Sequence, residues 1–309
     1  MAISSQAQEE LKHLLSAPVI WDAPLEAWTT FRIGGPAEAL VTVENEDELI
    51  ELLKFCKRYE VDWLVIGKGS NILVSDDGYP GIVITLGSGF KFVSSQPGEQ
   101  DGEVLVDAGA AHGLSTLADY CGAEGFTGME FCAGIPASVG GAAVMNAGAH
   151  GGEISGIVHR ATIVSAEGRE VLSSDMLRFH YRRWLDMEEW RKTSLVTALQ
   201  FKLKTGNSVN ILAEMKLLRK QRWDRQPVGM PNAGCCFKNP EVGSAGQLID
   251  QAGLKGLRIG DAEVSEKHAN FIVNRGRATA SDVRKLMQQV QACVAEKYGV
   301  NLEPEVRIL

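Results

Sequence analysis

The chain has 309 residues, enough for two or three domains, and its 45% hydrophobic and 23% charged content is typical of a globular enzyme. Its net charge of -8 argues against nucleic acid as the main partner, although a few cationic or backbone N–H groups could still hold a ligand phosphate. The first residues contain no basic segment followed by an apolar run. We therefore expect no signal peptide, no membrane insertion and a cytoplasmic location.

The cysteines and histidines indicate neither a disulfide framework nor a metal site. Six cysteines are too few for a disulfide scaffold in a chain of this length. Cys235 and Cys236 are adjacent, which is not the spacing of a zinc site, and no two histidines lie four residues apart. The other four are expected to be reduced core residues: Cys56, Cys121, Cys132 and Cys293.

Hydrophobic periodicity predicts alternating strands and helices in the first 124 residues. A short helix within residues 1–15 would place Leu11, Leu14 and Leu15 on one face. Two more helices are predicted at 46–59 and 114–124. Strands are predicted at 39–43, 63–66, 72–74, 81–86 and 104–108.

The rest of the chain predicts a hairpin, a boundary and a second α+β region. The hairpin combines 157–164 with 170–172 around Ala166-Glu167-Gly168. A strand at 195–203 precedes the polar turn Thr205–Ser208, a candidate domain boundary. The elements expected beyond it are a basic helix at 209–221, apolar segments at 247–252, 264 and 269–273, a long helix at 281–298 and a short terminal strand.

The segment from Phe131 to Gly152 is rich in glycine and carries no charged side chain. Because glycine tolerates positive φ and has no Cβ, this segment could be a loop that lies against a large flat ligand or a phosphate. A buried packing loop is the alternative.

Two shorter glycine-rich segments precede it. Gly67-Lys68-Gly69-Ser70-Asn71 follows a predicted strand and could form a nest of backbone N–H groups for an anion. Thr29–Ala37 contains Gly34 and Gly35 after an arginine. Each could also be a structural turn, but together the three segments suggest an extended ligand such as a dinucleotide.

Three polar segments in the second half could carry chemistry. The guanidinium groups of Phe179–Trp184 could pair with a substrate carboxylate, or this cluster could cap a strand at the surface. Asn232–Pro240 contains a cysteine after a glycine, and a thiol with its ordinary pKa of ~8.5 can donate a proton as well as attack an electrophile. Carboxylates near a chain end are usually solvated, so Leu302–Arg307 alone indicates no site.

In this order, the segments resemble the UDP-N-acetylenolpyruvoylglucosamine reductase family, flavoenzymes that make UDP-N-acetylmuramate for bacterial peptidoglycan. The resemblance covers the chain from Trp28 to Arg307. The length of the chain is similar to that of members of the shorter, type II subfamily. The most specific motifs are Gly-Ile-Pro-Ala-Ser-Val-Gly-Gly-Ala with Asn-Ala-Gly at 134–148, Tyr-Arg at 181–182, Ala-Gly-Cys-Cys-Phe-Lys-Asn-Pro at 233–240 and Pro-Glu-Val-Arg at 304–307.

The resemblance implies an α+β fold class, with a two-subdomain FAD-binding module of the PCMH type, as in vanillyl-alcohol oxidases, and a C-terminal α+β substrate-binding domain. The implied bounds are 1–84 with the terminal strand 302–309 for subdomain 1, 85–206 for subdomain 2 and 207–301 for the substrate-binding domain. NADPH is the implied hydride donor. FAD is expected to be non-covalent, because Pro36-Ala37 follows Gly34-Gly35 where many related oxidases carry a flavin-linked histidine.

The resemblance also implies the residues of the site. Hydride would reach the vinyl carbon β to the carboxylate of UDP-N-acetylglucosamine enolpyruvate. Arg182, assisted by Glu305, would stabilise the resulting enolate-like charge, and Cys235 would protonate the α carbon. Tyr181, Lys238 and Asn239 would hold the substrate. The residues expected at FAD are Thr30, Arg32, Gly34, Gly35, Gly67, Lys68, Gly69, Ser70, Asn71, Gly134, Ile135, Pro136, Ser138, Gly140, Gly141, Asn146, Ala147 and Gly148.

Two positions depart from the family pattern. Many members have serine where this chain has Cys235, and many have serine where Trp184 stands. Cys235 is preferred to Cys236 as the proton donor because it directly follows Gly234. Neither metal nor an obligate protein partner is implied. Two rival hypotheses stay open: a related FAD oxidase of a sugar or hydroxy acid, and a nucleotide-sugar-binding protein without turnover.

Overall fold

The computed structural model describes residues 3–309, which divide by their contacts into two compact units. Unit 1 comprises the chain up to Trp21, Glu38–Gly67 and Pro80–Lys220. Unit 2 comprises Asp22–Ala37, Lys68–Tyr79 and Gln221–Leu309. Two of the glycine-rich segments therefore group with the C-terminal part of the chain. The three-part domain division expected above is a different partition, and it stays a prediction.

Two β-sheets form the framework of the first part of the chain. A four-stranded sheet has the order β1-β2-β5-β3, in which β3 and β5 are parallel, and contains β1 (Ile20–Pro24), β2 (Pro36–Val43), β3 (Trp63–Val65) and β5 (Tyr79–Leu86). An antiparallel sheet has the order β12-β11-β15-β7-β6, with β8 also paired to β15. Its strands are β6 (Val93–Pro97), β7 (Glu103–Gly109), β8 (Phe126–Thr127), β11 (Val158–Ser165), β12 (Gly168–Ser173) and β15 (Ser194–Thr205).

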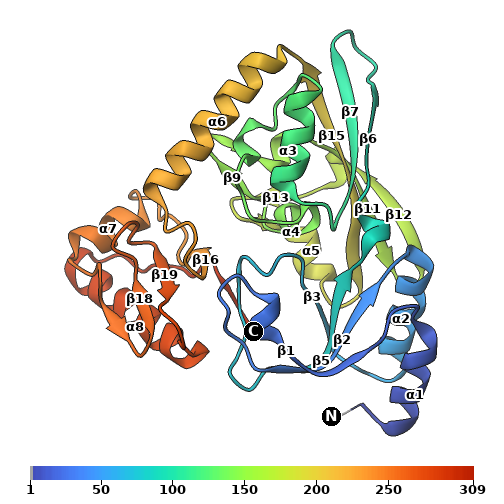
Figure 1. Ribbon diagram of the computed structural model, residues 1–309, viewed down its shortest axis with the longest axis horizontal. Helices are drawn as coiled ribbons and strands as arrows, with labels where there is room; N and C mark the ends of the chain where they lie inside the picture. Colours follow the sequence, from blue (N-terminus) through green and yellow to red (C-terminus); the bar gives the residue numbers. More distant parts are fainter. Residues whose placement is uncertain (1–2) are drawn as a thin grey trace. The chain divides into compact units, whose positions relative to one another are not determined.

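The helices of unit 1 cover these sheets with their apolar faces. The helix α2 (Glu46–Arg58) begins at Asn45, whose side chain accepts the Glu48 N–H, and its acidic first turn and basic last turn complement the helix dipole. With α1 (Ser5–Leu14) it buries an apolar face against β2 and β5. The helices α3 (Leu114–Ala123) and α4 (Val139–Val144) belong to the core of the antiparallel sheet, and α4 contacts β7 and β15 (Figure 1).

Several short elements lie between the main strands, and two of them contain the motif at 179–184. They are β9 (Gly148–Ala149), β10 (Gly152–Glu153), β13 (Phe179–His180), β14 (Arg183–Trp184) and α5 (Leu185–Trp190). The strands β13 and β14 pair with each other, as do β9 and β10. The hairpin thus formed by β13 and β14 places Tyr181 and Arg182 at its turn.

Unit 2 is a small antiparallel sheet with two helices. The strand order is β16-β19-β18-β17, formed by β16 (Asn232–Cys235), β17 (Arg258–Ile259), β18 (Ala262–Val264) and β19 (Phe271–Asn274). The helix α8 (Ala280–Tyr298) packs against β17 and β18, and α7 (Ala245–Gln251) lies beside it (Figure 1). Phe31, Ile33 and Leu73 complete the same core. The strand β4 (Ile72–Leu73) pairs in parallel with the terminal strand β20 (Arg307–Ile308).

Most predicted elements are confirmed, and the exceptions have physical reasons. The two residues Ala166-Glu167 form the turn of the predicted hairpin, since Ser165 pairs with Gly168. The predicted basic helix is longer, at α6 (Ser208–Arg225). The expectation of a loop throughout 131–152 is wrong, because α4 lies inside it. The strand β6 was missed because its polar, mostly exposed sequence shows no hydrophobic alternation.

Among residues 3–309, no helix combines the length and the apolar character needed to cross a lipid bilayer.

Candidate active site

Two glycine-rich segments are bonded to each other in unit 2. The backbone N–H of Thr30 donates to the Gly69 carbonyl at 3.1 Å, and the Thr30 hydroxyl oxygen lies 3.3 Å from the same carbonyl oxygen. Gly69 has φ +60°, and a Cβ there would lie 2.1 Å from the Trp28 carbonyl oxygen, so only glycine fits. Within the described chain, the N–H groups of Lys68, Gly69 and Ser70 donate no hydrogen bond. Backbone donors around a left-handed residue form an anion-binding nest, which suits a dinucleotide phosphate.

The same segments are attached to the C-terminal motifs. The Thr30 hydroxyl donates to the Asn232 carbonyl at 2.7 Å, and the Asn232 N–H returns a bond to the Thr30 carbonyl at 3.2 Å. The Asn71 side-chain amide donates to the Glu305 carbonyl at 3.1 Å, and the Asn71 carbonyl accepts the Arg307 N–H at 3.0 Å. Four sequence motifs far apart in the chain therefore form one assembly within unit 2.

Cys235 lies at an irregularity in β16. It pairs with Phe271 after a register shift, and the preceding Gly234 has φ +78°. A bulge of this kind re-aims the side chain that follows it. Cys235 is half-buried, whereas Cys236 is 1% exposed, and burial raises the pKa of the Cys236 thiol to about 12. The placement therefore favours Cys235 over Cys236 as the reactive thiol.

Glu305 lies beside this cysteine pair because the terminal segment pairs with it. The Glu305 N–H donates to the Cys236 carbonyl at 2.8 Å, and the Lys238 N–H donates to the Glu303 carbonyl at 2.9 Å. Glu305 is half-buried, while Glu303 is exposed and forms an ion pair with the Lys238 ammonium at 3.3 Å. The tail is thus a packed segment, and Glu305 is its more protected carboxylate.

Asn239, expected at the substrate, also has a bond within the protein. Its side-chain oxygen accepts the Ala245 N–H at 3.1 Å at the beginning of α7, where Ser244 is the N-cap. Asn239 itself is exposed. The side-chain amide nitrogen is therefore the group of Asn239 that suits a ligand.

The segment 134–148 in unit 1 contains both packing glycines and exposed ones. A Cβ at Gly67 would lie 2.2 Å from the Ser138 hydroxyl oxygen, and a Cβ at Gly140 would lie 2.9 Å from that of Ala110. Ser138 is the N-cap of α4, and its hydroxyl accepts the Gly141 N–H at 3.2 Å. Gly67 and Gly140 are therefore required by packing. Gly141, which is exposed, remains suited to contact with a ligand.

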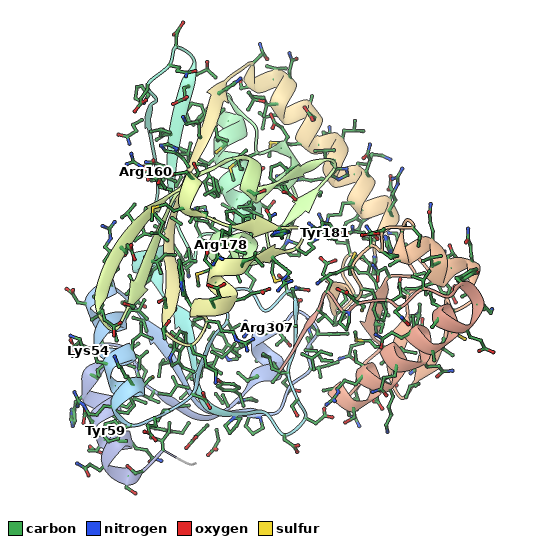
Figure 2. All side chains as sticks on the ribbon, turned by 180° about the vertical axis from the view of Figure 1, so that it is seen from behind. Lys54, Tyr59, Arg160, Arg178, Tyr181 and Arg307 are labelled. Carbon is green, nitrogen blue, oxygen red and sulfur yellow. The ribbon has the colours of Figure 1, made fainter. Side chains whose placement is uncertain are left out.

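Arg182 is joined to the same segment. Its guanidinium donates to the Gly148 carbonyl at 2.9 Å and to the Asn146 carbonyl at 3.5 Å. It also lies 5.1 Å from the centre of the Tyr181 ring, which is exposed at the hairpin turn (Figure 2). Arg182 has φ +58° and Asn146 φ +40°, a conformation that is uncommon outside glycine. The structure thus brings together two motifs that the sequence separates.

Trp184 packs inside the protein beneath the hairpin formed by β13 and β14 and stabilises it. It is fully buried against Phe179, with ring centroids 4.9 Å apart, and its indole N–H donates to Asp186 at 3.0 Å. Asp186 also accepts the Arg178 backbone N–H at 2.8 Å and pairs with the Arg178 guanidinium. Burial alone would raise the pKa of Asp186, but the bonds from Arg178 and Trp184 lower it below its usual value. Trp184 is therefore a packing residue of the Arg182 turn.

Two residues near Cys235 were not identified from the sequence. Arg222, at the end of α6, is half-buried; burial lowers the pKa of Arg222, and the neighbouring Cys235 opposes that effect. Asn270 is buried, and its side chain exchanges hydrogen bonds with the Phe237 backbone at 3.0 and 2.8 Å. Asn270 could have been noticed in the sequence, because it directly precedes the apolar run Phe-Ile-Val and is therefore a polar residue at the start of a buried strand.

The described residues contain no group of three or more His, Cys, Asp or Glu side chains that could hold a metal ion. All six cysteines are free. Cys56, Cys121 and Cys132 are buried as predicted, whereas Cys293 is only half-buried.

Comparison with protein families assigns two parts of the chain. Residues 37–173 match the FAD binding domain family, and residues 226–309 match the C-terminal domain of UDP-N-acetylenolpyruvoylglucosamine reductase. The UDP-N-acetylenolpyruvoylglucosamine reductase of Lachnoclostridium phytofermentans is 41% identical over 97% of this chain and 96% of that protein. The chain belongs to the UDP-N-acetylenolpyruvoylglucosamine reductase family. The enzyme of the same name from Bacillus subtilis is 40% identical, over 97% of each chain.

A solved structure of this family has the same fold. The crystal structure of UDP-N-acetylenolpyruvylglucosamine reductase from Thermus caldophilus superposes with a TM-score of 0.77 at 36% identity, covering 94% of this chain and 97% of that one. The expected fold class, an FAD-binding module followed by a C-terminal α+β domain, is confirmed. The residue roles inferred from the motifs are proposals, which follow.

Proposed function

We propose that this protein reduces the enolpyruvyl group of UDP-N-acetylglucosamine enolpyruvate to give UDP-N-acetylmuramate, with bound FAD and with NADPH as the electron donor. The observation that carries the proposal is the pairing of the Cys235 segment with the Glu305 segment in a chain that belongs to the reductase family. These two segments would have no assigned role in a sugar or hydroxy-acid oxidase. The reaction would place the protein in the cytoplasm, in peptidoglycan synthesis, and hence in cell shape and division.

The cofactor would be held non-covalently by the three glycine-rich segments. The unbonded N–H groups of Lys68, Gly69 and Ser70 fit its diphosphate, and Thr30 is bonded to the Gly69 carbonyl beside them. Arg32, Gly34, Gly35 and Asn71 would complete this part of the site. The uncharged segment 134–148 would contribute backbone that does not repel a phosphate, at Gly134, Ile135, Pro136, Ser138, Gly140, Gly141, Ala147 and Gly148. When bound, FAD supplies a carrier that accepts a hydride from NADPH and transfers it to the substrate.

Arg182 would stabilise the negative charge that builds up on the substrate. Hydride addition at the vinyl carbon leaves enolate-like charge on the α carbon and the carboxylate. A guanidinium matches a carboxylate with two parallel hydrogen bonds, and a preorganised charge stabilises a developing anion most effectively. The bonds from Arg182 to the carbonyls of Asn146 and Gly148 fix the guanidinium before the substrate binds.

Cys235 would complete the reaction by donating its thiol proton to the α carbon. Cys235 is half-buried at the bulge, whereas Cys236 is enclosed. Glu305 would assist Arg182 at the substrate carboxylate, either protonated or through a water molecule. Tyr181, Lys238 and Asn239 would hold the carboxylate and the UDP phosphates.

A steady-state experiment under nitrogen tests the function. NADPH oxidation should depend on added UDP-N-acetylglucosamine enolpyruvate, with one product, two hydrogens heavier than the substrate, for each NADPH consumed. Turnover that requires oxygen and no NADPH would favour the oxidase hypothesis instead. Binding of the substrate without any NADPH oxidation would favour a binding protein that lacks turnover.

A further inference from the structure

We infer that Asn146 is a positioning residue for Arg182, and that its side chain does not bind the cofactor. The inference rests on the proposed role of Arg182, which it deepens by naming the residue that fixes the arginine. It also argues against the expectation that Asn146 is a ligand of FAD, because the residue is fully buried.

The Asn146 side chain is enclosed by the protein and uses both of its polar atoms there. Asn146 has no exposed surface. Its amide nitrogen donates to the His180 carbonyl at 3.0 Å, and its amide oxygen accepts the Ser155 N–H at 2.9 Å. Because the amide has no exposed surface and each of its polar atoms already has a partner inside the protein, it is not available to a dinucleotide.

The same residue touches the arginine turn in two places. Its side chain holds the carbonyl of His180, which lies two positions before Arg182 in the hairpin. Its own carbonyl accepts the Arg182 guanidinium at 3.5 Å, and the nearby Gly148 carbonyl accepts it at 2.9 Å. Asn146 therefore links the backbone of the turn to the carbonyls that orient the guanidinium.

The backbone conformation explains why an asparagine occupies this position. Asn146, His150 and Arg182 all have positive φ, at 40°, 53° and 58°. Asparagine enters this left-handed region more readily than other residues with a side chain. Conformations of this kind cluster at functional sites, and they persist only where surrounding bonds hold them. The two bonds of the Asn146 amide are such bonds.

The test separates the two halves of the catalytic cycle in the holoenzyme. Asn146→Gly accepts positive φ but deletes both side-chain bonds. We expect normal flavin content and a normal rate of flavin reduction by NADPH, while reoxidation by UDP-N-acetylglucosamine enolpyruvate slows by about 10²-fold, as expected when a catalytic group is displaced. Asn146→Asp has the same shape but loses the donor to His180, and it should show the same selective defect if the glycine variant does not fold.

Two controls make the outcome specific. Ser155→Ala keeps the N–H that Asn146 accepts, so its reoxidation rate should equal that of the wild type. In an Arg182→Ala background, Asn146→Gly should slow reoxidation no further, because both changes act through the same guanidinium. Loss of flavin, equal slowing of both half-reactions, or additive slowing in the double variant would overturn the inference. A normal Arg182→Ala enzyme would instead contradict the proposed role of Arg182.

Discussion

The Arg182 turn and the Cys235 bulge are held in place by different kinds of bonds. At Arg182, two residues with positive φ are fixed by a guanidinium that donates to backbone carbonyls and by a buried amide that donates to one carbonyl and accepts one N–H. At Cys235, neighbouring segments are joined mainly by backbone pairs, such as Glu305 N–H to the Cys236 carbonyl at 2.8 Å. One site depends on a few side chains, and the other depends on the main chain.

This difference predicts different responses to mutation. Backbone pairing survives replacement of a side chain, so variants at Cys235 should keep their structure and report chemistry directly. Bonds from a buried side chain are lost with that side chain, and the partners left behind in the interior cost additional free energy. Variants around Arg182 should therefore change stability or geometry together with rate.

The largest expected effect is at Cys235, and it should be purely chemical. Cys235→Ala removes the proposed proton donor, and a positioned acid contributes about 10²–10⁴-fold to rate. Flavin reduction by NADPH should be normal, and reoxidation by the enolpyruvyl substrate should slow by that factor in stopped-flow absorbance. Cys236→Ala is the control with a normal reoxidation rate. If Cys236→Ala shows the defect and Cys235→Ala does not, the donor has been assigned to the wrong thiol.

The second-largest expected effect is a loss of stability on replacing Asp186. Asp186→Ala leaves the indole N–H of Trp184 and the backbone N–H of Arg178 without their acceptor, at a cost of about 2 kcal/mol in the free energy of unfolding. Glu189→Ala removes only an exposed partner of Arg178 and should cost far less in the same urea titration.

The Asp186 effect should also depend on pH. Because the folded-state pKa of Asp186 lies below its unfolded value of about 3.9, the carboxylate contributes fully above that value. The contribution is lost as pH falls through the lower folded-state pKa. The stability gap between wild type and Asp186→Ala should therefore be constant near neutrality and narrow below about pH 4. A gap that widens in acid would contradict this account of Asp186.

A smaller loss of stability is expected at Asp76, whose side chain holds the first residues of α8. The Asp76 carboxylate accepts the N–H groups of Ala280 and Ser281, at 2.7 and 2.9 Å, at the beginning of α8. Burial alone would raise the pKa of Asp76, but these bonds and the Ser281 hydroxyl lower it. Asp76→Asn should cost about 1 kcal/mol in urea unfolding, as for loss of a helix cap. The neighbouring Asp77→Asn is the matched control, and an equal loss in both variants would refute the anchor.

Local secondary structure could be predicted from the sequence better than the contacts between distant segments. The long helices and the hairpin at 158–173 follow from periodicity and turn chemistry, which are local. The helix α4 was missed because its sequence, Val-Gly-Gly-Ala-Ala-Val, contains two glycines, which have poor helix propensity. Tertiary packing overrides that preference in the folded protein.

The contacts of Asn146 and Trp184 could not be predicted for a different reason. The bond from Asn146 to His180 joins residues 34 positions apart, and nothing in either motif indicates the other. Trp184 stands where the family pattern offers a small polar residue, and only the structure shows its indole bonded to Asp186. The motifs therefore name candidate site residues, while long-range packing determines the geometry of those residues.

Anaerobic reoxidation of the NADPH-reduced protein by UDP-N-acetylglucosamine enolpyruvate tests the central claim most directly. Wild-type protein should regain the spectrum of oxidised flavin in a single turnover, and Arg182→Ala should do so about 10²–10³-fold more slowly, the cost of removing one donor that stabilises a developing anion. Flavin that stays reduced in the wild type, or equal rates in the two proteins, would contradict the account.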